Sequence, residues 1–79
     1  MAQAWWETVD EIKTTPYGPT GPELRLQKGV YHYYDGSPSE DGYRFIWYKN
    51  GRLQSRPARI DDMASIDALV TAGRAKGWV

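Results

Sequence analysis

Apolar and polar residues alternate with a period of two from residue 24 onward, which is typical of β-strands. The first run separates into two faces, one with Leu24, Leu26, Val30, His32 and Tyr34 and the other with Arg25, Gln27, Tyr31 and Tyr33. Gly29 interrupts this run, and a glycine inside a strand often marks a bulge or a bend. We therefore expect one long kinked strand, or a short strand followed by a second one over 30–34. The next segment, 35–42, has the composition of a loop.

The dipeptide Asn50-Gly51 is the strongest local signal in the chain. It lies between an aromatic run, 43–49, and an arginine-rich run, 52–60. Asn-Gly favours a type I′ turn, because this turn needs positive φ at both of its central residues. The sequence therefore predicts a β-hairpin, and its register pairs Lys49 with Arg52, Trp47 with Gln54, and Phe45 with Arg56.

This register assigns the side chains of the hairpin to two faces. One face carries Tyr43, Phe45, Trp47, Arg52, Gln54, Arg56 and Ala58, and the other carries Ile46, Tyr48, Leu53, Ser55 and Pro57. Pro57 has no N–H to donate to a neighbouring strand, so we expect the return strand at the edge of the sheet.

Residues 61–77 have the pattern of a helix, with signals at both ends. Asp61 or Asp62 can cap the N-terminus, and Gly77 fits the position just after the C-terminus. The apolar side follows helical spacing through Met63, Ile66, Leu69 or Val70, and Gly73, with Arg74 and Lys76 in the last turn. We expect Trp78 to fold back onto the core.

The pattern is less decisive before residue 24. Trp5, Val9 and Ile12 fall on one side of a helix, which predicts a short N-terminal helix over 5–13. Trp, Thr, Val and Ile are also common in strands, so a strand is the alternative. The segment 14–23 contains three prolines and two glycines, and we expect an extended connector there.

Together these elements predict one α+β domain over residues 1–79. We expect a small antiparallel sheet of three to four strands, a C-terminal helix packed on one face, and a short N-terminal helix or strand. A chain of 79 residues is near the lower limit for a fold held by a hydrophobic core alone. The sequence has no cysteine, so large side chains must support this core, and 14% of the residues are aromatic.

Charge and hydropathy narrow the classes of function. The 10 basic and 10 acidic residues balance, whereas a dedicated binder of duplex DNA carries a positive excess. A neutral chain has little charge repulsion to oppose a homodimer. No apolar run approaches the roughly 18 residues that span a bilayer. With no cysteine and no export signal at the N-terminus, we expect a soluble protein in the cytoplasm, without a membrane partner.

The sequence offers little for catalysis, a cofactor or a metal ion. His32 is the one histidine, and with no cysteine it has no partners at the spacing of a transition-metal site. We expect a packed or half-exposed strand histidine. The loop oxygens of Asp35, Ser37, Ser39 and Asp41 resemble the start of a calcium loop, but its glycine and closing glutamate are missing. We therefore predict no enzyme activity, no cofactor and no metal.

One candidate binding site lies on the first hairpin face. Tyr43, Phe45 and Trp47 form a column beside Arg52 and Arg56, and bases can stack on such rings while arginines hold the phosphates. The segment 42–60 contains five basic residues and no acidic one. This arrangement predicts a site for single-stranded nucleic acid.

The segment 42–48, taken with the preceding Asp41, also resembles the aromatic strand signature of RNA-recognition motifs over about eight residues. Asp41 stands where this signature has a basic residue, and Arg44 where it has a small one. A hairpin follows here, whereas that family has a helix. The order of three strands and a helix is also similar to that of the arm-binding domains of phage integrases. Both resemblances imply nucleic-acid binding.

The alternative interpretation is that Tyr43, Phe45 and Trp47 pack under the C-terminal helix, because a small sheet needs one face covered. The opposite face then presents an aromatic and aliphatic patch of Ile46, Tyr48 and Leu53, with Tyr31 or Tyr34. We favour a non-enzymatic protein-interaction module, a regulator or inhibitor, that binds an unidentified protein through this patch. A nucleic-acid-binding domain and a homo-oligomeric structural subunit are the alternatives.

Overall fold

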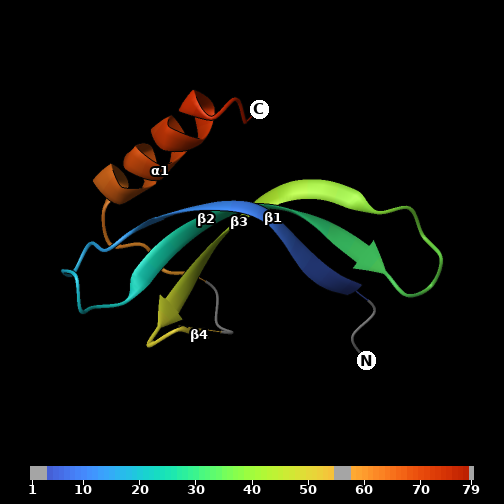
Figure 1. The fold of residues 1–79 in the computed structure, drawn as a ribbon, viewed down its shortest axis with the longest axis horizontal. Helices are drawn as coiled ribbons and strands as arrows, with labels where there is room; N and C mark the ends of the chain where they lie inside the picture. Colours follow the sequence, from blue (N-terminus) through green and yellow to red (C-terminus); the bar gives the residue numbers. More distant parts are fainter. Residues whose placement is uncertain (1–3, 55–57, 79) are drawn as a thin grey trace.

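The computed structural model describes residues 4–54 and 58–78, and Figure 1 shows a curled sheet with a helix across one face. In chain order the elements are β1 (Ala4–Thr14), β2 (Glu23–Tyr33), β3 (Glu40–Lys49), β4 (Arg52–Leu53) and α1 (Met63–Ala75). The strands lie side by side in the order β1-β2-β3-β4, and each neighbouring pair is antiparallel. The predicted α+β architecture, with a small antiparallel sheet and a C-terminal helix, is confirmed.

The N-terminal element is a strand, so the prediction of a short helix over 5–13 is wrong. β1 pairs with β2 along its length, and a bulge between Thr8 and Asp10 skips Val9. A bulge shifts the alternation of the two faces by one residue. Apolar residues on one face before the bulge and on the same face after it are therefore separated by an odd number of residues. The resulting spacing of Trp5, Val9 and Ile12 resembles that of a helix. Pairing with β2 also satisfies the backbone groups along one side of β1, whereas a short helix without packing is marginal.

β2 is one continuous strand and does not divide at Gly29. This glycine pairs with Thr8, directly before the bulge of β1. The backbone of Glu7 and the ring of Trp6 approach Gly29 so closely that a side chain has no room there. The glycine that interrupts the alternation of the sequence therefore marks the place where β1 bulges.

The connector between β1 and β2 is compact, which corrects the prediction of an extended segment over 14–23. The Gly18 N–H donates to the Thr15 carbonyl oxygen at 3.0 Å, and the Gly21 N–H donates to the Gly18 carbonyl oxygen at 3.0 Å. Two tight turns thus follow one another. Gly18 has a φ of 108°, a conformation that residues with a side chain rarely adopt.

The predicted turn between β3 and β4 is confirmed. Asn50 and Gly51 have φ angles of 52° and 76°, and a type I′ turn requires positive values at both positions. Lys49 pairs with Arg52, as the register of the hairpin predicts.

β4 is an edge strand of only two residues. Beyond it, the Gln54 N–H still donates to the Trp47 carbonyl oxygen at 2.8 Å, in agreement with the predicted pairing of these residues. The predictions for Ser55, Arg56 and Pro57 lie outside the described residues.

Both predicted end signals of α1 are confirmed. Asp62 is the N-cap, and its carboxylate accepts a hydrogen bond from the Ser65 N–H at 2.6 Å. This hydrogen bond holds the pKa of Asp62 below its usual value. Gly77 has a φ of 88°, as expected just after the helix. The chain then folds back, and the Trp78 N–H donates to the Gly73 carbonyl oxygen at 3.0 Å.

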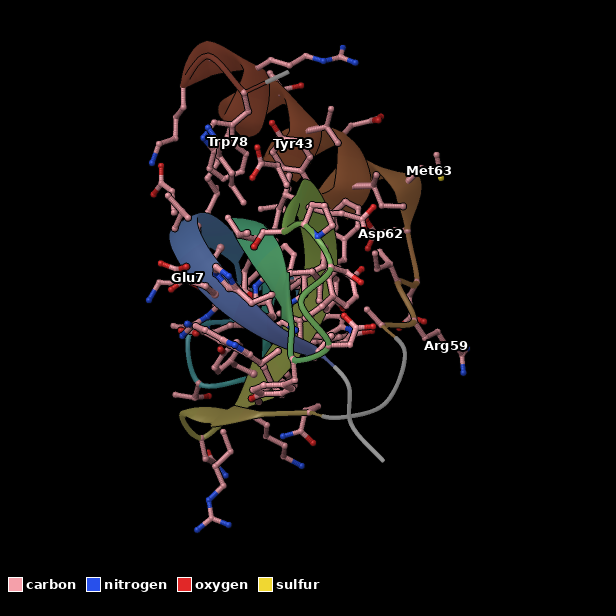
Figure 2. The ribbon with its side chains drawn as sticks, turned by 90° about the vertical axis from the view of Figure 1, so that its right-hand side faces the viewer. Glu7, Tyr43, Arg59, Asp62, Met63 and Trp78 are labelled. Atoms are coloured by element: carbon pink, nitrogen blue, oxygen red, sulfur yellow. The ribbon has the colours of Figure 1, made fainter. Side chains whose placement is uncertain are left out.

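The core lies between α1 and one face of the sheet. Its buried residues are Leu24, Leu26, Leu69 and Trp78, with Ile12, Phe45, Trp47 and Ile60 packed around them. Met63 is 69% exposed and points away from the fold, which corrects its predicted place on the apolar side of the helix (Figure 2). Among the described residues, no helix is long and apolar enough to cross a membrane.

Candidate interaction face

The face of the sheet opposite α1 carries a row of arginine and aromatic side chains. Leu24, Leu26, Phe45 and Trp47 belong to the core, so their neighbours along β2 and β3 point to the other side. We call this side the outer face, and its main members are Trp6, Glu11, Arg25, Gln27, Tyr31, Arg44, Ile46, Tyr48 and Leu53. In the part of the chain that the structure describes, no helix or strand covers it.

Gln27 is the centre of the outer face, and its side chain is 1% exposed. Its Nε2 donates to Glu11 Oε1 at 3.1 Å and to the Tyr48 hydroxyl oxygen at 3.4 Å. Its Oε1 accepts a hydrogen bond from Arg44 Nε at 2.7 Å. One buried amide therefore connects side chains from β1 and β3, and its hydrogen-bonding groups are satisfied.

Arg25 is fixed by two carboxylates and an aromatic ring. Its guanidinium lies 2.6 Å from Glu23 Oε1 and 3.1 Å from Glu11 Oε2. The same group lies 3.7 Å from the centre of the Tyr48 ring, within the range of a cation–π contact. The hydrogen bond from Arg25 is the main cause that lowers the pKa of Glu23, and the Lys13 charge adds to it.

Arg44 forms the second pair of an arginine and an aromatic ring. Its guanidinium carbon lies 4.9 Å from the centre of the Trp6 ring. The Trp6 Nε1–H donates to Thr8 Oγ1 at 3.0 Å, and the Tyr31 ring meets the indole edge-on at 5.1 Å. Within the described ranges, no carboxylate lies within 4.0 Å of the Arg44 guanidinium.

The residues predicted for a protein contact are only partly brought together. Tyr48 of β3 pairs with Leu53 of β4, which is 43% exposed, and Ile46 lies half-buried on the same face. Tyr34 follows the end of β2 that is far from Tyr48, because Tyr48 pairs with Glu23 at the beginning of that strand. The structure therefore joins Ile46, Tyr48 and Leu53, and it separates Tyr34 from them.

The rings predicted to stack on nucleic acid lie on the side of α1. Phe45 and Trp47 pack against the core, and the Trp47 indole donates to the Arg59 carbonyl oxygen at 2.9 Å. Tyr17 partly covers Trp47, with ring centres 6.1 Å apart. Tyr43 is more exposed and lies 5.7 Å from the Trp78 ring. Arg52 is exposed at the hairpin, and Arg56 lies outside the described residues.

His32 joins three segments at the other end of the sheet. Its Nε2 lies 2.6 Å from Glu7 Oε1 on β1, and its Nδ1 lies 3.1 Å from the Ser39 hydroxyl oxygen. The Trp5 ring stacks on the imidazole at 4.4 Å. The histidine is half-exposed, as the sequence predicts. Among the described residues, no group of three or more His, Cys, Asp or Glu side chains is placed to hold a metal ion.

Four residues that organise the outer face were not identified from the sequence as binding residues. They are Trp6, Arg25, Gln27 and Arg44. The alternation along β2 does place Arg25 and Gln27 on the outer face. The partners of these side chains come from β1 and β3, so the pattern of one strand does not reveal them.

Comparison of the chain with protein-family models, with curated proteins and with solved structures finds no match. The geometry of the outer face is therefore the basis for assigning a function.

Proposed function

We propose that the chain is a non-enzymatic protein-interaction module, a regulator or inhibitor, that binds a protein partner through the outer face. The observation that supports this proposal is the row of Trp6, Arg44, Tyr48 and Arg25, on a face that no helix or strand of the described residues covers. Trp, Tyr and Arg are the residue types that contribute most of the binding free energy in protein interfaces. The absence of cysteine suits the cytoplasm, which we include in the proposal.

Preorganisation of these side chains also supports binding. Arg25 and Arg44 are each held by a hydrogen bond and a ring, and both connect to Gln27 or its partners. Ordering a long side chain on association costs roughly 0.5–1.5 kcal/mol. Arginines that are already ordered avoid most of this cost. A partner with an acidic or polar group opposite Arg44, and an apolar one opposite Leu53, matches the face.

The balance of charge favours a protein over a nucleic acid on this face. Glu11 and Glu23 both lie against Arg25, and carboxylates repel phosphate groups. The nucleic-acid alternative uses Tyr43, Phe45 and Trp47 on the other side and stays a prediction. A homo-oligomeric subunit, whose outer face is covered by a second copy, is the third candidate.

The proposal is tested by comparing variants of the outer face with matched variants elsewhere. Arg44→Ala has the control Arg59→Ala, and Leu53→Ala has the control Met63→Ala, since both control side chains are exposed. The wild-type chain is used to capture partners from a lysate of the source organism, and each is then titrated by calorimetry. We expect about a tenfold loss of affinity or more for the outer-face variants and no loss for the controls.

Equal retention by all four variants would count against the outer face. Light scattering of the wild-type chain tests the third candidate, the homo-oligomeric subunit. This candidate requires a dimer in solution that the Ile46→Arg variant dissociates. Titration with a single-stranded oligonucleotide at two salt concentrations tests the nucleic-acid alternative. This alternative requires binding that weakens steeply as the salt concentration rises.

A further inference from the structure

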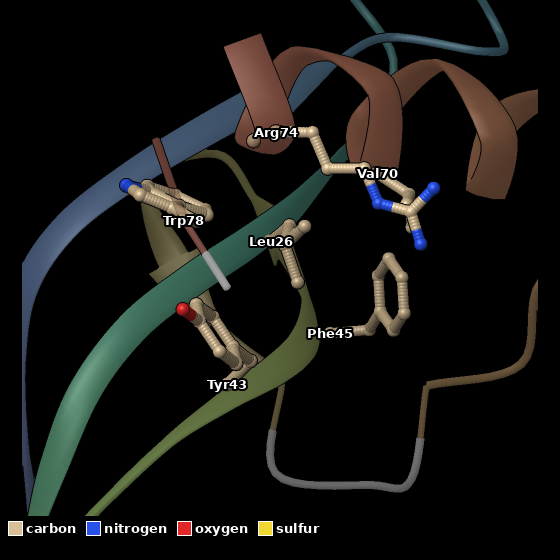
Figure 3. A pocket seen from close by; sticks show the side chains of 7 residues that line it. Leu26, Tyr43, Phe45, Val70, Arg74 and Trp78 are labelled. Carbon is tan, nitrogen blue, oxygen red and sulfur yellow. The ribbon is translucent and has the colours of Figure 1, made fainter. Parts of the chain in front are cut away.

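A groove of about 270 Å³ lies between the C-terminal half of α1 and the sheet, on the side opposite the outer face. Figure 3 shows its floor at Leu26, with Phe45 and Tyr43 of β3 on one side and Trp78 at one end. α1 lies closer to β1 and β2 than to β3. The rings of β3 are therefore not fully covered by the helix, and the groove is the space that remains.

The turn after α1 builds the end wall of this groove. Trp78 folds back so closely on Gly73 that a Cβ at residue 73 would lie 2.9 Å from the indole. The Trp78 N–H also donates to the Gly73 carbonyl oxygen, and the indole is buried. Lys76 Nζ lies 5.8 Å from the centre of the Trp78 ring and 2.9 Å from Asp10 Oδ2, with which it forms an ion pair. The wall is thus a fixed aromatic surface.

Arg74 supplies a cation at the mouth of the groove. Its side chain runs along α1 past Val70, and the guanidinium ends above the Phe45 ring (Figure 3). Among residues 4–54 and 58–78, no carboxylate lies within 4.0 Å of this guanidinium, and no side-chain hydrogen bond engages it. An apolar cavity with one unpaired guanidinium at its rim is complementary to an apolar molecule with one negative charge.

We propose that this groove binds a small apolar carboxylate, an aryl or short-chain aliphatic acid. The carboxylate pairs with Arg74, and the hydrocarbon part lies between Phe45 and Trp78. An apolar cavity of about 150 Å³ holds benzene, so 270 Å³ accommodates roughly ten non-hydrogen atoms. This inference does not rest on the proposed function, because the two sites lie on opposite sides of the sheet.

The ligand is expected to carry a single carboxylate rather than a phosphate. One guanidinium forms two parallel hydrogen bonds with one carboxylate, which balances its single charge. A phosphate monoester carries about two negative charges and needs further cations, and apart from the Tyr43 hydroxyl and the Trp78 indole N–H the remaining side chains that line the groove are apolar and uncharged.

The test uses 3-phenylpropionate and its neutral isostere 3-phenylpropanamide as probes, with ¹⁵N-labelled full chain followed by NMR. For the acid we expect saturable shifts at the amides of Leu26, Phe45 and Val70 and at the Trp78 indole N–H. The expected Kd is on the order of 10⁻⁴ M. The amide should bind about tenfold more weakly, because it loses a charge-assisted hydrogen bond.

Three variants test whether the probes bind in this groove. Arg74→Gln should weaken binding of the acid about tenfold and leave binding of the amide unchanged. Val70→Phe, which fills the cavity, should abolish binding of both probes, while Arg44→Gln on the outer face should change neither. Arg74 is an exposed side chain, so we expect the Arg74→Gln variant to keep its fold. Unchanged backbone N–H signals in the ¹⁵N spectrum of the free variant check this.

Two results would overturn the proposal. The first is an absence of shifts at the groove up to about 10 mM acid, which corresponds to no useful affinity. The second is equal affinity for the acid and the amide in the wild-type chain, because it would show that Arg74 does not recognise the charge.

Discussion

The indole of Trp6 lies over Gly29, and a Cβ added at residue 29 would meet Trp6 Cζ2 at 2.5 Å and the Glu7 carbonyl oxygen at 2.3 Å. Because one of these contacts is with backbone, rotation of a side chain does not relieve it. We expect Gly29→Ala to lower the free energy of unfolding by about 2–3 kcal/mol. Urea denaturation followed by far-UV circular dichroism measures this change.

The matched control is the glycine across the sheet. Gly42 pairs with Gly29, has nothing within 4 Å of an added Cβ and does not have a positive φ. Gly42→Ala should therefore leave stability unchanged or raise it slightly. Equal losses for the two variants would contradict the close contact between Trp6 and Gly29.

The amide of Gln27 is expected to contribute to stability through the groups that it satisfies. Gln27→Leu keeps the site filled but removes a donor from Glu11 and an acceptor from Arg44. Leaving such groups unpaired costs about 1–3 kcal/mol, which the urea midpoint measures. Gln54→Leu is the control, since this glutamine is exposed near the hairpin. A neutral effect of Gln27→Leu would mean that water replaces the amide.

The N-cap of α1 offers a third test of stability. Asp62→Ala removes the acceptor of the Ser65 N–H, and we expect a loss of about 1 kcal/mol in the free energy of unfolding. The control is Asp67→Ala, at an exposed position of the helix, which removes the same charge as Asp62→Ala. It should have little effect on the free energy of unfolding. A thermal or urea transition distinguishes the two variants. The cap is not important for stability if they behave alike.

Stability is expected to fall in acid because several carboxyl groups, among them Asp10, Glu23 and Asp62, have lowered pKa values in the folded chain. Asp10 bonds to Lys76, Glu23 to Arg25, and Asp62 to the Ser65 N–H. The ordinary pKa values of these groups are 3.8 for the aspartates and 4.5 for the glutamate. A lowered folded-state pKa gives stability that is present above the unfolded pKa and lost as the pH falls through the folded one.

The urea midpoint should therefore be steady from neutral pH to about pH 5 and decline below about pH 4.5. Asp10→Asn removes one of these groups and should reduce the decline. Asp41→Asn, at an exposed carboxyl group of β3, is the control. A midpoint that does not change between about pH 5 and pH 3 would exclude a contribution from these carboxyl groups.

Local signals in the sequence predicted the parts of the fold that local chemistry determines. Asn50-Gly51 specifies its turn through backbone conformation, and Asp62 and Gly77 specify the ends of α1 in the same way. The identity of β1 could not be predicted, because the bulge at Val9 depends on pairing with β2. A bulge leaves no signature in one strand that distinguishes it from helical spacing.

The candidate site was predictable only in part for a related reason. The alternation of the hairpin places Ile46, Tyr48 and Leu53 on one face correctly. The contacts of Arg25 with Tyr48 and of Arg44 with Trp6 join different strands, so they depend on the register of the whole sheet. Tyr34 has the right residue type for an interface, but it follows the wrong end of β2.

The bulge at Val9 also affects how the chain behaves at high concentration. β1 forms one edge of the sheet over eleven residues, and at the other edge the two residues of β4 pair with the last two residues of β3. An open edge can pair with another copy and begin aggregation, but an extra residue in mid-strand breaks the even row of N–H and C=O groups that such pairing needs. The charged side chains of Glu7, Asp10 and Glu11 flank the break. We therefore expect the irregularity in β1 to hinder pairing with another copy at this edge.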